Sequence, residues 1–467
     1  MANLLIFGID PLPESGTVYL SGPANRTWHF VKPLINRGHS ITLICLNSDD
    51  KAIPSFSKRD LSEKFGAPLV IYNCSYESFI NIEKVNEIVN EVAPDAVIGT
   101  ASILPSYIAS HFADKYPFWA DFFGCPIAEI QSKSEVYNDD QSDSDLFHVW
   151  KMMKKILDNA DKFSSVSNRH KHSIIGQLAM EGRLNRFSAG YDFIHSMPCA
   201  FDIHNESMNT YTPDKPSYIR GIKTNKNDFL VYWSGFYNTW MDEETLFYGL
   251  ESAIKTNPRI KYISTGGGIT GYNEKSYKKF CELVNNSHVK DNFILLGWVD
   301  AELIPQCYQE CDLGINIDRF TYEGTLGSRN RIIHFLKAGL PVLSTNITEL
   351  TEDLSRNNLI HTFEIGNCKD LSLKLTELAE NKFLLLRNID NAKDFVSMEY
   401  NFENCVKDFL KFADQPEFSP DKKEKMNRQS ENNIENTFLN EAEKYSKFRE
   451  TDYDEKSILR KFKKFLF

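Results

Sequence analysis

The sequence predicts an α/β protein made of two doubly wound domains in succession, followed by a helical C-terminal tail. Over roughly the first 200 residues, short apolar runs alternate with amphipathic segments of helix length. Such alternation is typical of a parallel sheet whose two faces are covered by helices. The alternation stops in a polar stretch at 202–227, then starts again, and a second change to polar composition follows residue 413. These three observations set the expected boundaries of the domains.

Length and composition agree with this class. A chain of 467 residues with 42 % hydrophobic residues is long enough for two or three domains, each with its own core. The net charge of -11 excludes a protein whose whole surface binds nucleic acid. The nine cysteines are scattered, and only Cys307 and Cys311 are close, without the partners of a zinc site. With no signal-peptide pattern at the start and no apolar stretch of spanning length, we expect a cytoplasmic protein.

The first domain is expected to span residues 1–205. Its strands are predicted at 4–8, 41–46, 69–72, 96–100, 118–122 and 163–167. A helix is predicted at 26–36, because the segment is amphipathic and Gly38 follows it as a stop.

The second domain is expected to span residues 225–395. Its strands are predicted at 229–233, 261–264, 293–296, 313–317, 342–345 and 359–363, and its helices at 242–255, 274–284, 301–310, 328–337 and 369–380. Gly339 and Pro341 mark the end of one helix and the start of the next strand.

The end of the chain differs in composition from both domains. Residues 414–433 are predicted to form a polar, solvated linker, and 434–467 an amphipathic helical tail. In 457–467 the apolar side chains fall on one helix face and four basic side chains on the other. Such a segment can lie on an anionic membrane surface, pack on the protein or another subunit, or simply be a solvated face.

Glycines follow the first two strands of the second domain, where loops of an open α/β sheet approach a ligand. Ser234 and Gly235 follow the first strand, and Gly266 and Gly267 follow the second. Glycine amides there can reach phosphate oxygens without a Cβ in the way. In the first domain, Gly22, Asn25 and Arg26 are placed at a helix N-terminus facing the same cleft, with a plain surface loop as the alternative.

The strongest constellation lies between residues 315 and 345. A buried strand ends at Asp318 and Arg319, a loop carries Glu323 and Gly327, and a helix opens with Arg329, Asn330 and Arg331. Two arginines are unexpected in a first helical turn, because the helix dipole favours anions there. A bound diphosphate would resolve the conflict. The alternative is that both arginines pair with surface acids.

This region resembles the donor-binding half of GT-B glycosyltransferases, closest to the retaining family 4 type. The matching residues, in order, are Glu323-Gly324, Gly327 and Ala338-Gly339-Leu340-Pro341-Val342, with support from 293–299 and 311–315. The resemblance covers about residues 1–412 and is strongest for 229–345. It implies a GT-B fold of two facing Rossmann-like domains, with 400–412 crossing back to the first domain.

The resemblance also implies roles for residues. Its implied catalytic residues are Glu323, Arg331 and Asp121, the last with a turn or cap role as the alternative. Its implied donor-binding residues are Ser234, Gly235, Gly266, Gly267, Trp298, Val299, Arg319, Gly327, Arg329, Asn330 and His334, with Gly22, Asn25 and Arg26 on the acceptor side. His334 stands where the family has a second glutamate, and residues 234–240 lack the family's Arg and Lys. The phosphate-binding role therefore moves to Arg329 and Arg331, with Arg26 and Arg319 as further candidates.

The function implied is a retaining, metal-independent transfer of a sugar from a nucleotide diphosphate-sugar to a glycan or lipid-linked acceptor. No cofactor is expected beyond this co-substrate, and residues 457–467 are a candidate for contact with a membrane surface. Two alternatives stay open: a GT-B epimerase that acts on the nucleotide sugar alone, and a non-catalytic protein that keeps the fold as a scaffold.

Overall fold

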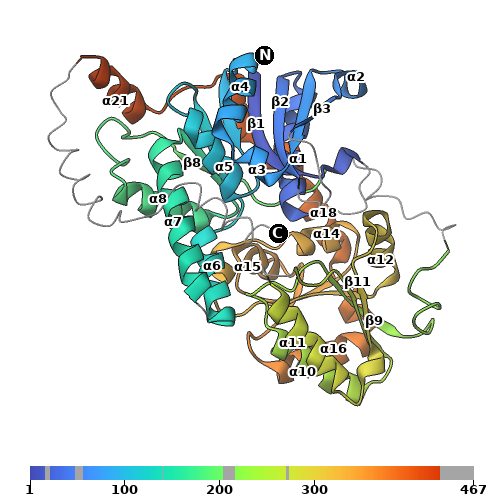
Figure 1. Cartoon of the computed structure of the whole chain (residues 1–467). Helices are drawn as coiled ribbons and strands as arrows, with labels where there is room; N and C mark the ends of the chain where they lie inside the picture. Colours follow the sequence, from blue (N-terminus) through green and yellow to red (C-terminus); the bar gives the residue numbers. More distant parts are fainter. Residues whose placement is uncertain (16–20, 48–55, 139, 203–215, 270–272, 432–467) are drawn as a thin grey trace.

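The chain folds around two separate β-sheets, each flanked by helices (Figure 1). A computed structural model describes residues 1–15, 21–47, 56–138, 140–202, 216–269 and 273–431. The first sheet has the strand order β3-β4-β2-β1-β5-β6-β7-β8, and the second has the order β11-β10-β9-β12-β13-β14. Neighbouring strands in the two described sheets are parallel, except β3 and β4, which are antiparallel. The predicted α/β class with two doubly wound domains is confirmed.

The first domain holds strands β1 (Asn3–Asp10), β2 (Ser40–Asn47), β3 (Ser57–Asp60), β4 (Leu69–Cys74), β5 (Ala96–Gly99), β6 (Phe118–Phe122), β7 (Lys162–Ser165) and β8 (Ile194–Ser196). Its helices are α1 (Gly22–Asn36), α2 (Ser62–Phe65), α3 (Tyr76–Phe79), α4 (Ile82–Val92), α5 (Ile103–Ala109), α6 (Pro126–Tyr137), α7 (Asp140–Asn159) and α8 (Asn168–Met180). Strand β1 is almost wholly buried because helices cover both faces of the sheet.

The second domain repeats the plan with strands β9 (Phe229–Ser234), β10 (Ile260–Thr265), β11 (Phe293–Gly297), β12 (Leu313–Asn316), β13 (Val342–Thr345) and β14 (His361–Phe363). Its helices are α10 (Glu243–Thr256), α11 (Glu274–Asn285), α12 (Ile304–Glu310), α13 (Tyr322–Leu326), α14 (Asn330–Lys337), α15 (Glu349–Arg356) and α16 (Cys368–Glu380). Two apolar clusters, one on each face of this sheet, form its core.

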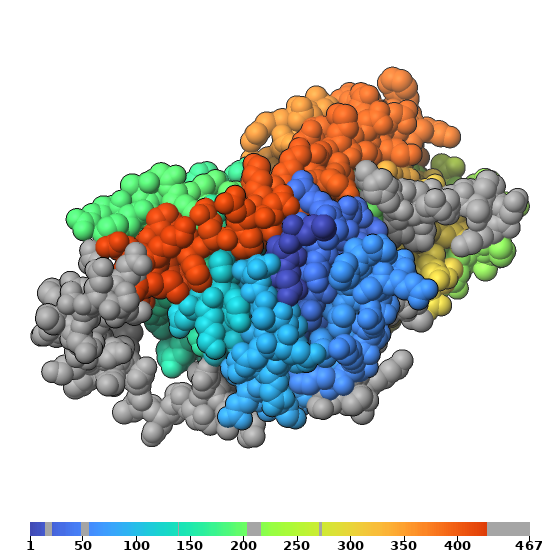
Figure 2. Space-filling view, turned by 90° about the horizontal axis from the view of Figure 1, so that it is seen from above, coloured from blue at the N-terminus to red at the C-terminus, as the bar shows by residue number. Residues whose placement is uncertain are grey.

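The segment after the second domain returns to the first. It contains α17 (Lys382–Leu385), α18 (Ile389–Glu399), α19 (Phe402–Cys405) and α20 (Lys407–Asp414). Phe402, Phe409 and Phe412 are buried in the same cluster as β1 and α1 of the first domain. In Figure 2 this orange-red segment runs from the second domain across the blue and cyan surface of the first.

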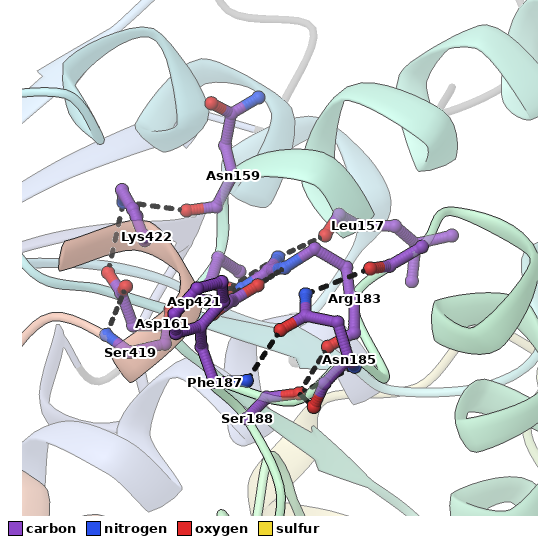
Figure 3. Close-up of polar contacts among 12 residues, drawn as sticks. Leu157, Asn159, Asp161, Arg183, Asn185, Phe187, Ser188, Ser419, Asp421 and Lys422 are labelled. Atoms are coloured by element: carbon purple, nitrogen blue, oxygen red, sulfur yellow. Dashed lines mark hydrogen bonds and ion pairs between the residues drawn. The ribbon is translucent and has the colours of Figure 1, made fainter. Parts of the chain in front are cut away.

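The stretch predicted to be a solvated linker at 414–433 is instead partly helical and docked. Helix α21 (Pro420–Glu431) begins beside the first domain, where Arg183 pairs with Asp421 and Lys422 pairs with Asp161 at 3.1 Å (Figure 3). Ser419 and Asp161 are fully buried. The segment is polar because its contact with the first domain consists of ion pairs and hydrogen bonds. Its composition alone therefore resembles that of a solvated linker.

Two other features differ from, or lie beyond, the expectations. The short strands β3 and β8 at the two edges of the first sheet were not predicted. The predicted tail at 434–467, with the membrane candidate 457–467, lies outside the described residues. Among the helices that are described, none is long and apolar enough to cross a bilayer.

Candidate active site at the domain junction

The carboxyl ends of β9, β10 and β11 are held together by glycine contacts. The Gly235 amide donates to the Thr265 carbonyl at 2.9 Å, and the Gly266 amide donates to the Gly297 carbonyl at 2.7 Å. A Cβ on Gly266 would lie 2.3 Å from the Gly235 carbonyl oxygen, and both residues have positive φ. The amides of Gly235 and Gly266, which were expected to meet phosphate, are therefore already used inside the sheet edge, and these two glycines serve close backbone packing.

Arg331, in the first turn of α14, lies over this glycine edge. Its guanidinium carbon is 3.6 Å from the centroid of the Trp233 ring, and Nη2 donates to the Phe236 carbonyl at 3.2 Å. Nη1 is buried and has no hydrogen-bond partner among the described residues. Burial lowers the pKa of Arg331 to about 10, so the group keeps its positive charge at neutral pH. Nη1 is thus a positively charged donor that is held in place and lacks an acceptor, which suits it to binding an anion.

His334 is one turn further along the same helix and carries a second unpartnered atom. Its Nδ1 is buried without a hydrogen-bond partner within the described part of the chain. Burial lowers the pKa of His334 to about 4, so the ring is neutral at physiological pH. A neutral imidazole can accept from or donate to a hydroxyl. Arg331 and His334 thus give one face of α14 two polar groups available to a ligand.

Arg329 does not share this availability. Its two terminal nitrogens donate to both Glu323 oxygens at 3.0 and 2.7 Å, and Nε donates to Asp318 at 2.7 Å. A Cβ on Gly327 would lie 2.4 Å from a Glu323 oxygen, so Gly327 leaves room for this pair. The expectation that Arg329 faces a diphosphate is wrong for this structure, because two buried carboxylates already neutralise it. Arg329 thus pairs with acids, but with buried ones and not with the surface acids of the alternative, and Arg331 has no acidic partner among the described residues.

Glu323 is 3 % exposed and lies at the start of α13. Burial raises its pKa, while the charge and hydrogen bonds of Arg329 act in the opposite direction. The two-pronged contact with Arg329 requires acceptor oxygens, which the ionised carboxylate supplies. Each oxygen still has a lone pair that can accept from a sugar hydroxyl.

Arg319 is also committed to the protein. Its Nη2 pairs with Glu243 at 2.5 Å and its Nε donates to the Met241 carbonyl at 2.9 Å. Its expected contact with a diphosphate is therefore not what the structure shows. Ser234 bonds through its side chain to Tyr308, and Trp298 is 43 % exposed with its ring edge-to-face on Phe236.

The first domain brings the start of α1 to the same junction. A Cβ on Gly22 would lie 4.0 Å from Asn330 Nδ2 and 3.7 Å from the Phe123 ring. Ser21 caps the helix by accepting from the Ala24 amide at 3.2 Å, and Asn25 is half-buried in the first turn. Gly22 and Asn330 therefore meet across the two domains.

Arg26 and Asp121 form a buried pair below this point. The Arg26 nitrogens donate to the two Asp121 oxygens at 3.0 and 2.8 Å, and Asp121 is 0 % exposed. Ser164 also donates to Asp121, at 2.6 Å. The expectations that Asp121 contacts substrate and that Arg26 faces the cleft are corrected here, because each satisfies the other inside the core.

Glu129 is a residue of the junction that the sequence did not single out. It is half-buried in the first turn of α6, and helix α6 contacts α13, which carries Glu323. Pro126 opens the helix and an acid follows in its first turn, a combination that ordinary helix starts also show. The local pattern therefore could not distinguish a site residue from a helix-start acid.

Comparison with known proteins identifies the fold. No family model matches the chain. No curated protein matches its sequence either. Among solved structures, HepE from Anabaena, in complex with UDP and glucose, is 14 % identical with a TM-score of 0.63, over 88 % of this chain and 99 % of that one. Sucrose-phosphate synthase from Thermosynechococcus elongatus is 11 % identical with a TM-score of 0.64, over 88 % and 98 %. An α,α-trehalose-phosphate synthase (UDP-forming) from Burkholderia vietnamiensis is 8 % identical with a TM-score of 0.63, over 88 % and 98 %.

At these identities the similarity establishes the fold. The chain has the GT-B architecture of these glycosyltransferases, with two facing Rossmann-like domains.

Proposed function

We propose that the protein is a glycosyltransferase that moves a sugar from a nucleotide diphosphate-sugar to a glycan or lipid-linked acceptor, with retention and without a metal ion. The GT-B fold supports this proposal, as do the similar structures named above, one of which holds UDP and glucose. Retention, metal independence and the acceptor class rest on the sequence resemblance to family 4 enzymes.

The unpartnered Nη1 of Arg331 is the observation that carries the proposal. Buried polar groups in proteins are nearly always hydrogen-bonded, so a buried cationic donor without an acceptor indicates a ligand site. Trp233 and the Phe236 carbonyl hold the guanidinium in place before a ligand arrives. A preorganised cation at a point where charge develops is the largest single source of rate enhancement in many enzymes.

The proposed chemistry is cleavage of the bond between the sugar and the diphosphate. As that bond breaks, negative charge grows on the diphosphate, and Arg331 stabilises it more in the transition state than in the ground state. His334 contributes a neutral hydrogen bond on the same helix face, and Glu323 accepts from a hydroxyl of the sugar. Arg329 keeps Glu323 ionised and correctly oriented.

Replacing Arg331 tests the proposal. In calorimetry with UDP, GDP and ADP, the wild-type protein should bind at least one nucleotide, and Arg331→Ala should weaken that binding. In a transfer and hydrolysis assay with a panel of nucleotide sugars, Arg331→Ala should lower turnover about tenfold or more. Arg356→Ala is the matched control, because Arg356 is a surface cation on α15 that pairs with Glu352 of its own helix. Equal turnover in wild-type and Arg331→Ala protein would contradict the assignment.

One specific observation favours a non-catalytic scaffold as a second candidate. Residues 234–240 contain no Lys or Arg, and Arg26, Arg319 and Arg329 are all paired with acids, so few cations face a diphosphate. A scaffold would bind no nucleotide in the calorimetric panel. An epimerase would bind one and release an altered nucleotide sugar without any acceptor present.

A further inference from the structure

Glu129 reaches from the first domain toward the Glu323–Arg329 pair of the second. Helix α6 packs against α13, and the Glu129 carboxyl is within electrostatic range of both Glu323 and Arg329. It is the acid of the first domain that the structure places against this pair.

The Glu129 carboxyl has no hydrogen bond or ion pair with any residue that the structure describes. The neighbouring acids are satisfied: Glu323 and Asp318 share Arg329, and Asp121 pairs with Arg26. Arg329, the cation that acts on Glu129, already pairs with two other carboxylates. Glu129 is therefore a half-buried polar group that the protein positions without using.

Gly124 leaves room for the Glu129 carboxyl in its observed position. A Cβ on Gly124 would lie 2.1 Å from Glu129 Oε1 and 3.4 Å from its carboxyl carbon, with no other heavy atom among its close contacts. The side chain therefore folds back over the loop between β6 and α6, in space that only glycine leaves free. The backbone of Gly124 is not in the left-handed region, so alanine is tolerated there by the main chain.

The surroundings of Glu129 keep it protonated at neutral pH. Burial and the nearby Glu323 carboxylate raise the pKa of Glu129 to about 8, and Arg329 opposes this only in part. On the other elements packed against α6, Asp145 of α7 is paired with Lys133 of α6 at 3.0 Å. At the far end of α6, Lys275 at the start of α11 lies over the Tyr137 ring, near the Lys278–Glu274 pair. The pKa of Glu129 is therefore set by burial and by the charges of Glu323 and Arg329 at the domain junction.

We propose that Glu129, as a neutral carboxylic acid, donates a hydrogen bond to a hydroxyl of the sugar bound at the junction, opposite the accepting carboxylate of Glu323. This inference rests on the proposed function. A sugar hydroxyl can both donate and accept a hydrogen bond. A protonated acid that donates a hydrogen bond and a carboxylate that accepts one can therefore fix the sugar ring between them. Because the two groups come from different domains, they meet the same sugar only when the domains are together.

Two substitutions of Glu129 distinguish a neutral hydrogen-bond donor from an ionised base at this position. Glutamine keeps the shape and a donor, so Glu129→Gln should retain turnover within about threefold at pH 7, whereas Glu129→Ala should lose about tenfold or more with a raised KM. Wild-type activity should decline as the pH rises through about 8, because the donor proton is then lost, and Glu129→Gln should not show this decline. Glu135→Gln, at an exposed position of the same helix, is the matched control and should behave like the wild type.

Gly124→Ala supplies an independent variant that leaves every charge in place. It should push the Glu129 carboxyl away and raise KM for the donor or acceptor several-fold, with an unchanged melting temperature. Carbon-detected NMR of the wild-type protein should show the Glu129 carboxyl protonated at pH 7, whether or not a substrate has been found.

Three results would overturn the inference: ionisation of Glu129 below pH 6, loss of activity in Glu129→Gln equal to that in Glu129→Ala, or the same alkaline decline in wild type and Glu129→Gln. Failure of the proposed function is recognised separately, because the wild-type protein would then bind no nucleotide in calorimetry.

Discussion

At the scale of residues, the site is built from charges that look alike in the sequence and behave differently in the structure. Arg329 and Arg331 are two positions apart, yet Arg329 is held by two buried carboxylates and Arg331 keeps a nitrogen without a partner. Asp121 lies in β6 and Glu129 in the helix that follows it, yet Asp121 pairs with Arg26 while Glu129 has no ion pair among the described residues. Which charge remains available to a ligand depends on the tertiary partners of its neighbours.

The buried histidines make the free energy of unfolding depend on pH. His170 is 0 % exposed, neither ring nitrogen has a hydrogen-bond partner in the described chain, and burial lowers its pKa to about 4. An unfolded histidine titrates near pH 6.5, so between these values the unfolded state binds more protons, and stability falls as the pH falls. We expect the His170 contribution to be complete above about pH 6.5 and to decrease by about 2–3 kcal/mol toward pH 4.

Urea unfolding of wild-type and His170→Leu protein at pH 7 and pH 4.5 measures this contribution. The variant should lose less stability on acidification than the wild type. Because His29 and His334 also have lowered pKa values, some of the slope should remain in the variant. Parallel losses in the two proteins would show that His170 is not buried in its neutral form.

The sequence predicted the part of the candidate site whose residues lie close together along the chain. The position of Glu323, Arg331 and His334 on one loop and helix follows from chain order and helix periodicity, which a sequence displays. The acidic partners of Arg26 and Arg319 come from distant elements, at separations of 95 residues for Asp121 and 76 residues for Glu243. Those pairings depend on strand order and helix packing, which single-chain patterns do not specify.

At the scale of elements, long apolar strands and amphipathic helices were predicted well and the polar contacts between elements were not. Strands β1, β2, β9 and β10 are buried on both faces, and their composition shows it. Strand β3 has the sequence SKRD, with alternating half-buried and exposed residues at a sheet edge, and carries no apolar signal. Helix α21 has a low apolar content for the same reason, since it docks by charge.

The docking of α21 is testable through Asp421. Burial raises the pKa of Asp421, but the hydrogen bonds and charge of Arg183 outweigh it and hold the pKa below its ordinary value. Removing the carboxylate leaves Arg183 with the carbonyls of Leu157 and Ala160, and a hydrogen bond to a charged group contributes about 1.5–3 kcal/mol. Asp421→Ala should therefore increase amide hydrogen exchange in residues 420–426 by about tenfold or more.

The control for this experiment is Lys423→Ala. Lys423 is about half exposed and pairs with Glu417 at the surface, where ion pairs contribute little. Exchange in the α21 segment that is unchanged by Asp421→Ala would show that the buried pair does not hold the helix.

At the scale of the whole molecule, the two domains are joined at a point where a carboxylate of one meets a helix start of the other. Glu349, in the first turn of α15, accepts from the backbone amides of Asn168 and Arg169 at 3.2 and 2.9 Å. These amides open α8, whose N-cap Ser167 donates to the Leu326 carbonyl at 2.8 Å. An anion at a helix N-terminus is stabilised by the free amides and the helix dipole. The contact thus ties the first domain to the segment that carries Glu323.

Weakening this contact should loosen the domains and lower the apparent affinity for the donor. Glu349→Ala removes charge-assisted hydrogen bonds that contribute about 1.5–3 kcal/mol each, and Arg169 retains its pair with Glu352 at 2.6 Å. If substrate binds only to the closed arrangement, the apparent Kd rises by the factor by which that arrangement is depleted.

We expect faster amide exchange at residues 167–170, a larger radius of gyration in small-angle scattering, and a KM for the donor raised about tenfold with kcat changed less. Glu282→Ala, at an exposed position on α11, should leave all three unchanged. A Glu349→Ala protein with wild-type exchange and KM would mean that other contacts hold the domains together, because loss of the carboxylate that accepts from the first amides of α8 would then have no consequence for closure.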